Sequence, residues 1–211
     1  RLAKGRPVVR LEPVAPDSGD PPLTPVNPDW PAYLLHTSAT TGRPKAVVQS
    51  HRNVLACALT YARRGGVGAG DQVSLLARFT FDGGMMDLFG ATLSGACLHV
   101  IDPLVPAPEL RHRLATTGVS LLHCTPTLFR HLVHDVSEVD PSLEGIRTVV
   151  LGGEEATGED LRRFFSSFPA NCVLINGLGP TECTLALQYR ASRADLGLAA
   201  LPVGYPVAGV E

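Results

Sequence analysis

A run of hydroxyl side chains, followed by a glycine, a proline and a lysine, lies between positions 37 and 45 of this 211-residue chain. Hydroxyl groups, backbone N–H groups exposed by a tight turn, and an ammonium group are the donors that phosphate oxygens accept at close range. The run lacks the glycine spacing of a Walker A loop. It predicts a phosphate-binding loop, although a hydrophilic hairpin loop can have the same composition. The residues concerned are Thr37, Ser38, Thr40, Thr41, Gly42 and Lys45.

A second turn, Asn176-Gly-Leu-Gly-Pro-Thr-Glu182, combines exposed backbone N–H groups with the hydroxyl of Thr181 and the carboxylate of Glu182. A carboxylate beside a phosphate loop repels phosphate unless a cation lies between them, and Mg²⁺ bound by one carboxylate and phosphate oxygens resolves this conflict. Taken alone, Gly-Pro-Thr-Glu is an ordinary turn before a strand. Paired with the first loop, it predicts a magnesium site at Glu182.

These segments resemble motifs of the adenylate-forming superfamily, which includes acyl-CoA ligases, luciferases and the adenylation domains of nonribosomal peptide synthetases. Residues 37–45 resemble its phosphate-binding loop, and residues 176–182 resemble its Asn-x-Tyr-Gly-Pro-Thr-Glu motif. Residues 79–96 resemble the Phe-Asp segment of peptide synthetase adenylation domains. The resemblance covers nearly all of residues 30–209 in the family's order. The chain departs from the pattern at Ala39, Ala46 and Leu178, where the family has two glycines and a tyrosine.

The resemblance implies an ATP site and assigns roles within it. Lys45, Thr181 and Glu182 would be the catalytic residues, with Glu182 also the Mg²⁺ ligand. Thr181 would contact the α-phosphate, while Asn176 and Leu178 would border the adenine. The nucleotide-binding set implied by the resemblance and by the glycine turns after predicted strands is Thr37, Ser38, Thr40, Thr41, Gly42, Lys45, Gly152, Gly153, Asn176, Leu178 and Gly179.

The resemblance also implies an amino-acid site. Asp82 would pair with the α-ammonium group of the substrate, because a charged amine taken out of water needs a charged, hydrogen-bonded partner. The alternative is that Asp82 caps the following helix. His123 is either a polar contact to the substrate or a core histidine. The side-chain pocket would be lined by Gly83, Met86, His123, Val150 and Gly177.

The implied reaction is ATP-dependent activation of an amino acid to aminoacyl-AMP, followed by transfer to the phosphopantetheine thiol of a peptidyl carrier protein. Adjoining synthetase domains would be further partners. The family's ribose-binding aspartate and its C-terminal lid lysine have no counterpart here, so we expect an internal part of an adenylation domain that is inactive alone. Two alternatives are a degenerate adenylation domain kept as a scaffold, and an acyl-CoA or acyl-AMP ligase, against which Asp82 argues.

Composition narrows the choice of partners. The net charge is −2 without a basic tract, which argues against nucleic acid, and no apolar run is long enough to cross a membrane. Five cysteines without a Cys-x-x-Cys pair or a signal peptide predict reduced, buried thiols in a cytoplasmic protein. His131 and His134 are expected to form a surface pair and not a metal site.

The elements that must position these residues alternate between strand and helix over most of the chain. This order predicts an α/β layered fold with a largely parallel sheet flanked by helices, whose ligands lie beyond the carboxyl ends of the strands. Helices are expected to begin after Ser50, Thr125 and Thr157, whose side chains can cap them. The prolines of residues 1–31 predict a connector with a possible edge strand, and residues 32–211 predict a partial adenylation-domain core.

Overall fold

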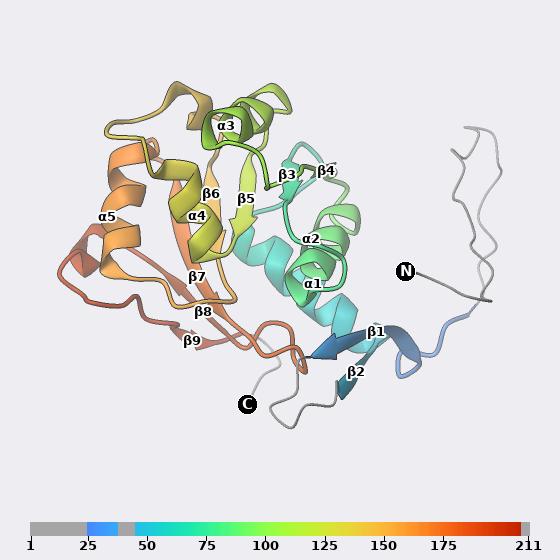
Figure 1. Cartoon of the computed structure of the whole chain (residues 1–211). Coiled ribbons are helices and arrows are strands. Elements are labelled where there is room, and N and C mark those ends of the chain that lie inside the picture. The colour runs from blue at the N-terminus through green and yellow to red at the C-terminus, as the bar shows by residue number, and fades with distance from the viewer. Residues whose placement is uncertain (1–24, 38–44, 208–211) are drawn as a thin grey trace.

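A seven-stranded sheet is the centre of the computed structural model, which describes residues 25–37 and 45–207. Its strand order is β4-β3-β5-β6-β7-β8-β9. The pairs from β4 to β7 are parallel, and β8 and β9 continue the sheet in antiparallel pairs. The prediction of a largely parallel sheet is confirmed (Figure 1). The strands are β3 Gln72–Leu75, β4 Cys97–Val100, β5 Leu121–Cys124, β6 Thr148–Leu151, β7 Val173–Leu178, β8 Leu187–Arg190 and β9 Tyr205–Pro206.

Helices cover both faces of this sheet. The helices are α1 His51–Gly65, α2 Asp82–Thr92, α3 Ala107–Thr116, α4 Pro126–Val133 and α5 Gly158–Ser167, with short 3-10 turns at Pro141–Leu143 and Arg193–Asp195. Helices α1 and α2 pack on one face and α3, α4 and α5 on the other (Figure 1). Side chains of β5 alternate between these layers, since Leu121 belongs to the α1/α2 cluster while Leu122 and Cys124 belong to the other.

The predicted helix caps are present. Ser50, Thr125 and Thr157 each accept a hydrogen bond from a backbone N–H in the first turn of the helix that follows. Thr157 also forms a reciprocal capping box with Asp160. These local signals therefore fix where α1, α4 and α5 begin.

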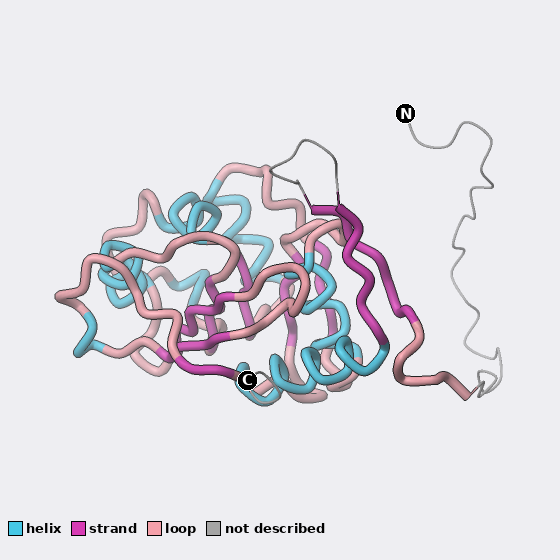
Figure 2. The backbone as a smooth tube through the Cα atoms, turned by 90° about the horizontal axis from the view of Figure 1, so that it is seen from below, coloured by secondary structure: helices cyan, strands magenta, loops and turns pink. Residues whose placement is uncertain are grey.

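The strand that precedes the phosphate loop does not join the main sheet. Strand β1, Pro31–Thr37, pairs with β2, Lys45–Ser50, in a separate two-stranded antiparallel sheet. Antiparallel strands can be joined by a short loop, whereas a parallel strand needs a crossover. Figure 2 shows this hairpin beside the main body, at the start of α1.

The spacing of Val54, Leu55, Ala58 and Leu59 predicts that these residues form the apolar face of α1, but the buried face of the helix differs. Leu55 is 49% and Leu59 40% exposed, while Ala58, Tyr61, Ala62 and Gly65 are buried. The reason is the close approach of α2. A methyl group on Gly90 would overlap the ring of Tyr61, so the large aromatic side chain fits only against glycine.

Three smaller expectations have mixed outcomes. Most of the predicted connector, residues 1–31, lies outside the described residues, as does any strand before position 25. Cys124 and Cys172 are buried free thiols, but Cys97 and Cys183 are exposed, so the prediction of uniformly buried cysteines is wrong. Within residues 25–37 and 45–207, no helix has the length and apolar character needed to cross a bilayer.

Candidate active site

A cavity of about 830 Å³ opens at the carboxyl ends of the parallel strands. Its wall is formed by residues at or just after the ends of β3, β4, β5, β6 and β7, together with the first turn of α2. Parallel strands present their carboxyl ends at the same sheet edge, which is where α/β folds bind ligands. The cavity therefore lies at the sheet edge where the sequence predicts a ligand site.

All six residues predicted to contact the substrate line this one cavity. They come from α2 and from the ends of β5, β6 and β7. The fold therefore brings together residues that are nearly one hundred positions apart in the sequence. They are Asp82, Gly83, Met86, His123, Val150 and Gly177.

Asp82 lies in the first turn of α2 and does not occupy the N-cap position. The N-cap is Phe81, which makes no side-chain cap hydrogen bond. Oδ1 of Asp82 accepts a hydrogen bond from the backbone N–H of Gly83 at 2.8 Å. The helix N-terminus stabilises a negative charge at this position, and Asp82 presents that charge to the cavity.

His123 is buried and also lines the cavity. It therefore combines the two predicted alternatives, a core histidine and a polar contact to the substrate. Its side chain is 9% exposed, and its Nδ1 lies 2.8 Å from Oδ1 of Asp87. The same oxygen accepts a hydrogen bond from the hydroxyl of Tyr61 at 2.7 Å. Burial alone would lower the pKa of His123, but the charge and hydrogen bond of Asp87 outweigh it and raise that pKa above its usual value.

Asp87 and Tyr61 were missed by the sequence analysis. The available signal was a lone acid inside an otherwise apolar helix, Met85-Met-Asp-Leu-Phe89. A carboxylate there must be buried against a partner, but nothing local says that the partners come from α1 and β5.

The cavity wall contains some of the predicted nucleotide-binding residues and not others. Gly152, Gly153 and Gly179 line the cavity. Asn176 does not line the cavity, and its side-chain amide donates to the carbonyl oxygens of Leu201 and Pro202. A border between Asn176 and adenine stays a prediction.

Leu178, at the end of β7, is 47% exposed and is not part of the cavity wall. Ser38, Ala39, Thr40, Thr41 and Gly42 lie outside the described residues. Thr37 and Lys45 are opposite each other across the β1–β2 hairpin, at the last described positions on either side of that loop. Lys45 is exposed, like its neighbour Ala46.

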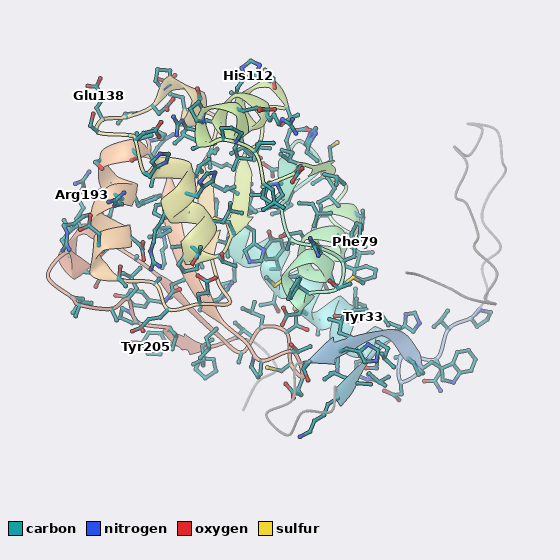
Figure 3. The ribbon with its side chains drawn as sticks, in the orientation of Figure 1. Tyr33, Phe79, His112, Glu138, Arg193 and Tyr205 are labelled. Atoms are coloured by element: carbon teal, nitrogen blue, oxygen red, sulfur yellow. The ribbon has the colours of Figure 1, made fainter. Side chains whose placement is uncertain are left out.

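The turn that carries Thr181 and Glu182 is held beside this hairpin. Nε2 of Gln49, a buried residue of β2, donates to the carbonyl oxygens of Thr181 at 2.8 Å and Glu182 at 3.0 Å. Tyr33 of β1 packs against the same region, stacked on Phe89 of α2 at 6.2 Å between ring centroids. Figure 3 shows Tyr33 between the hairpin and the helices. The hairpin and the turn that carries Glu182 thus lie on the same side of the molecule, as a shared phosphate and magnesium site requires.

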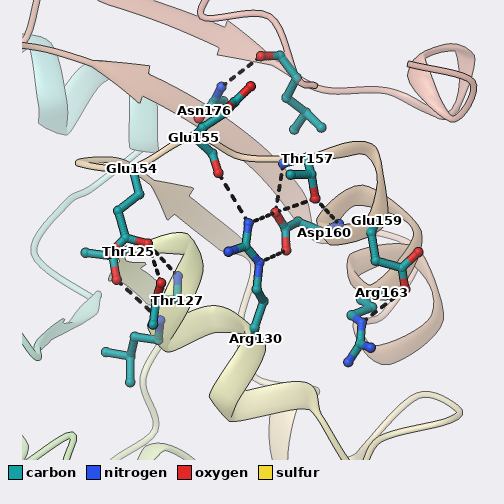
Figure 4. A network of polar contacts seen from close by, with 12 residues as sticks. Thr125, Thr127, Arg130, Glu154, Glu155, Thr157, Glu159, Asp160, Arg163 and Asn176 are labelled. Atoms are coloured by element: carbon teal, nitrogen blue, oxygen red, sulfur yellow. Dashed lines mark hydrogen bonds and ion pairs between the residues drawn. The ribbon is translucent and has the colours of Figure 1, made fainter. Parts of the chain in front are cut away.

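A polar network fixes the glycine turn after β6. Oε2 of Glu154 accepts from the backbone N–H and hydroxyl of Thr127 in α4, and these bonds lower the pKa of Glu154 below its usual value. Arg130, also of α4, donates to both carboxylate oxygens of Asp160 and to the carbonyl of Glu155 (Figure 4). The turn is therefore tied to α4 and α5.

Metal-ligating clusters of three or more side chains are absent from the described part of the chain. His131 and His134 form an exposed pair with stacked rings, as expected for a surface position. The carboxylate of Glu182 is exposed and makes no hydrogen bond or ion pair to any described residue. Its chemistry fits one Mg²⁺ ligand whose other ligands are phosphate oxygens and water.

The described residues form a largely parallel α/β sheet with a cavity at its carboxyl edge, and comparison with known proteins shows the family. The family model described as AMP-binding enzyme matches residues 3–211. The chain belongs to this family.

Surfactin synthase subunit 2 of Bacillus subtilis (strain 168) is 33% identical over 168 residues, which is 78% of this chain and 5% of that protein. The nonribosomal peptide synthetase FmoA3, solved in an AMPPNP-bound form, is 28% identical with a TM-score of 0.79 and is matched over 91% of this chain and 21% of its own. NpsA-ThdA, an artificially fused adenylation–PCP di-domain from Klebsiella oxytoca, is 27% identical with a TM-score of 0.75, over 90% of this chain and 38% of its own. The chain therefore spans a small part of the relatives it matches.

Proposed function

We propose that this chain forms the amino-acid pocket and part of the nucleotide site of a nonribosomal peptide synthetase adenylation domain. The observation that carries the proposal is the presence of Asp82 in a cavity at the carboxyl edge of the sheet. An acid held at a helix N-terminus pairs with the α-ammonium group of an amino acid. In support, FmoA3 has also been solved with alpha-methyl-L-serine-AMP.

The proposed reaction joins the amino acid to AMP. A carboxylate oxygen of the amino acid attacks the α-phosphorus of ATP, the bond to the bridging oxygen breaks, and aminoacyl-AMP and pyrophosphate form. The attacking carboxylate is already ionised, so no general base is needed. The protein contributes positioning and charge neutralisation, with Asp82 holding the amine while the glycine turns at Gly152 and Gly177 leave room for the substrate.

The phosphates would be held by the loop between β1 and β2, with Thr37 and Lys45 at its ends, and Thr181 would contact the α-phosphate. Glu182 would hold Mg²⁺, which neutralises phosphate charge when bound. The hydrogen bonds from Gln49 to the Thr181–Glu182 backbone support this arrangement, because they connect the strand after the loop to the acidic turn.

The proposed partner is a peptidyl carrier protein, whose phosphopantetheine thiol receives the aminoacyl group. The fused adenylation–PCP di-domain among the structural relatives supports this partner. Adjoining synthetase domains would complete the assembly, and the proposed location is the cytoplasm.

Replacing Glu182 tests the magnesium assignment. In the full-length protein, Glu182→Gln should lower amino-acid-dependent pyrophosphate exchange about 100-fold, because the amide removes a charge that acts at the transferring phosphate. Exchange would be measured over a range of Mg²⁺ concentrations, with the exposed Glu138→Gln as the matched control. Wild-type exchange from Glu182→Gln would remove Glu182 from the site.

A carboxylic-acid ligase that does not require an amine is the second candidate. The NpsA N-terminal subdomain, 26% identical, has been solved with 3-hydroxybenzoyl-AMSN, which carries no α-amine. Exchange assays with amino acids and their deaminated analogues separate the two candidates, since only an amino-acid enzyme should lose activity with the analogues.

The exposed Leu178, in the place of the family's tyrosine, favours a third candidate, a scaffold without nucleotide binding. Calorimetry of the full-length protein with Mg-ATP distinguishes it, because a scaffold would give no binding heat.

A further inference from the structure

Three buried side chains form a hydrogen-bonded chain at the cavity wall. Tyr61 of α1 donates to Oδ1 of Asp87 in α2, and the same oxygen lies 2.8 Å from Nδ1 of His123 in β5. Asp87 has no exposed surface, Tyr61 is 1% exposed and His123 8%. Because Oδ1 of Asp87 accepts from both neighbours, the hydrogen lies on Nδ1 of His123. The orientation of the imidazole ring is thereby fixed.

The opposite edge of the ring faces the cavity. Nε2 of His123 has no hydrogen-bond partner among residues 25–37 and 45–207, and His123 lines the cavity. A methyl group at Gly152 would lie 3.7 Å from Nε2, and one at Gly83 would lie 3.3 Å from Cε1. Glycine at both positions leaves open space around this edge of the ring.

The surroundings of that edge are apolar. Val150 is the cross-strand neighbour of His123, and Met86 and Leu185 line the same cavity and the same hydrophobic cluster. A ligand that fills this part of the cavity therefore contacts apolar side chains and the Nε2 atom of His123. An unpaired buried polar atom is costly, so a ligand group that pairs with Nε2 is favoured over one that only covers it.

The charges around His123 favour an uncharged partner. Asp87 already supplies a buried negative charge at Nδ1, and Asp82 lies close enough to contribute to the raised pKa of His123. Asp82 is neutralised by the substrate amine if the proposed function holds. A substrate side chain with a carboxylate would add a further negative charge near the buried Asp87, and a cationic one would be repelled by the imidazole when it is protonated.

We infer that His123, oriented by Asp87 and Tyr61, selects amino acids whose side chain carries an uncharged hydrogen-bonding group, a hydroxyl or a carboxamide. Such groups can both donate and accept. They therefore pair with Nε2 whether it is an acceptor in the neutral ring or a donor in the protonated ring. His123 contacts the substrate, while Asp87 and Tyr61 are positioning residues. This inference rests on the proposed amino-acid adenylation.

The test uses pyrophosphate exchange by the full-length protein with isosteric amino-acid pairs, threonine against valine and asparagine against leucine. In the wild type, the polar member of at least one pair should be preferred by about 10- to 100-fold in kcat/KM. His123→Leu should abolish that preference, and Asp87→Asn and Tyr61→Phe should reduce it. His123→Gln, which keeps polar atoms at the pocket edge, should restore part of it.

The ratio within a pair is the decisive quantity, because a merely structural defect lowers both members equally. His112→Leu, a substitution of an exposed histidine on α3, is the matched control and should leave the ratio unchanged (Figure 3). A valine or leucine preference in the wild type, a best substrate with a charged side chain, or an unchanged ratio in His123→Leu overturns the inference alone. Absence of exchange with every amino acid overturns the proposed function and the inference together.

Discussion

At the scale of single residues, the site depends on two carboxylates of α2 that have different surroundings. Asp82, in the first turn, is part of the cavity wall, and within the described residues its carboxylate accepts a hydrogen bond only from the backbone N–H of Gly83. Asp87, five positions later, is fully buried and forms hydrogen bonds with Tyr61 and His123. The first can meet a substrate, whereas the second acts through the imidazole. This difference separates substrate binding from positioning.

Asp82→Asn should raise the KM for the amino acid and lower kcat/KM by about 10- to 100-fold, because a hydrogen bond to a charged amine is lost. Pyrophosphate exchange in the full-length protein measures both constants. Deaminated analogues of the same substrate provide the control, since they lack the amine and should show no difference between wild type and variant. An equal loss with the analogues would mean that Asp82 stabilises the fold of α2 instead.

At the scale of elements, the turn between β7 and β8 that carries Thr181 and Glu182 contains a strained residue and is held in place by its neighbour β2. Thr184 has a φ of 61°, a conformation that a β-branched residue rarely adopts. A methyl group at Gly179 would overlap the carbonyl oxygen of Thr184, so the turn closes only with glycine there. Strained backbone of this kind persists where the surroundings hold it, and Gln49 supplies two of the hydrogen bonds that do so.

Gln49→Leu should lower kcat/KM for ATP about tenfold while the KM for the amino acid stays unchanged, because the turn with Thr181 and Glu182 loses two buried hydrogen bonds. Asn53→Ala is the matched control, since Asn53 donates to Oε1 of Gln49 and its loss leaves both Nε2 bonds in place. Steady-state exchange kinetics with each substrate varied in turn measure the effect. A parallel change in both KM values would contradict a specific effect on the turn.

At the scale of the whole molecule, buried or half-buried carboxylates join segments that are far apart in sequence. Asp71 accepts from Arg147 and Ser120, and Arg147 also donates to the carbonyl oxygens at the end of α1. Asp160 joins α5 to α4 through Arg130. Burial opposes the charged form of both acids, but their hydrogen bonds outweigh it, and the pKa values of Asp71 and Asp160 are lowered.

A lowered folded pKa makes stability depend on pH in one direction. The contribution of Asp71 and Asp160 is complete above the unfolded pKa of about 3.9 and is lost as pH falls through the lower folded values. The urea midpoint of the chain can be measured by circular dichroism between pH 6 and roughly pH 2.5. It should decrease as the pH is lowered below about 4.

The double variant Asp71→Asn, Asp160→Asn should be less stable at neutral pH and should show a shallower fall in acid. Glu138→Gln, Glu144→Gln is the comparison, since both of these acids are exposed and neither forms an ion pair with a described residue. An acid transition of unchanged steepness in the first double variant would exclude these two groups as its cause.

The sequence by itself determined the features that depend on near neighbours. The caps at Ser50, Thr125 and Thr157 and the alternation of strands and helices could be predicted because short-range hydrogen bonds and the hydrophobic period depend on consecutive residues. The six pocket residues were predicted from the resemblance to a known family, through the order of its motifs.

The tertiary structure alone decided which distant groups meet. Tyr61 and His123 contact Asp87 across 26 and 36 positions, Gln49 reaches Glu182 across 133, and the hairpin of β1 and β2 forms its own sheet. No local pattern encodes such contacts. The contacts of Asp87 arise because the packing of α1 and α2 on one sheet face buries its carboxylate, and burial without the hydrogen bonds of Tyr61 and His123 is too costly to persist.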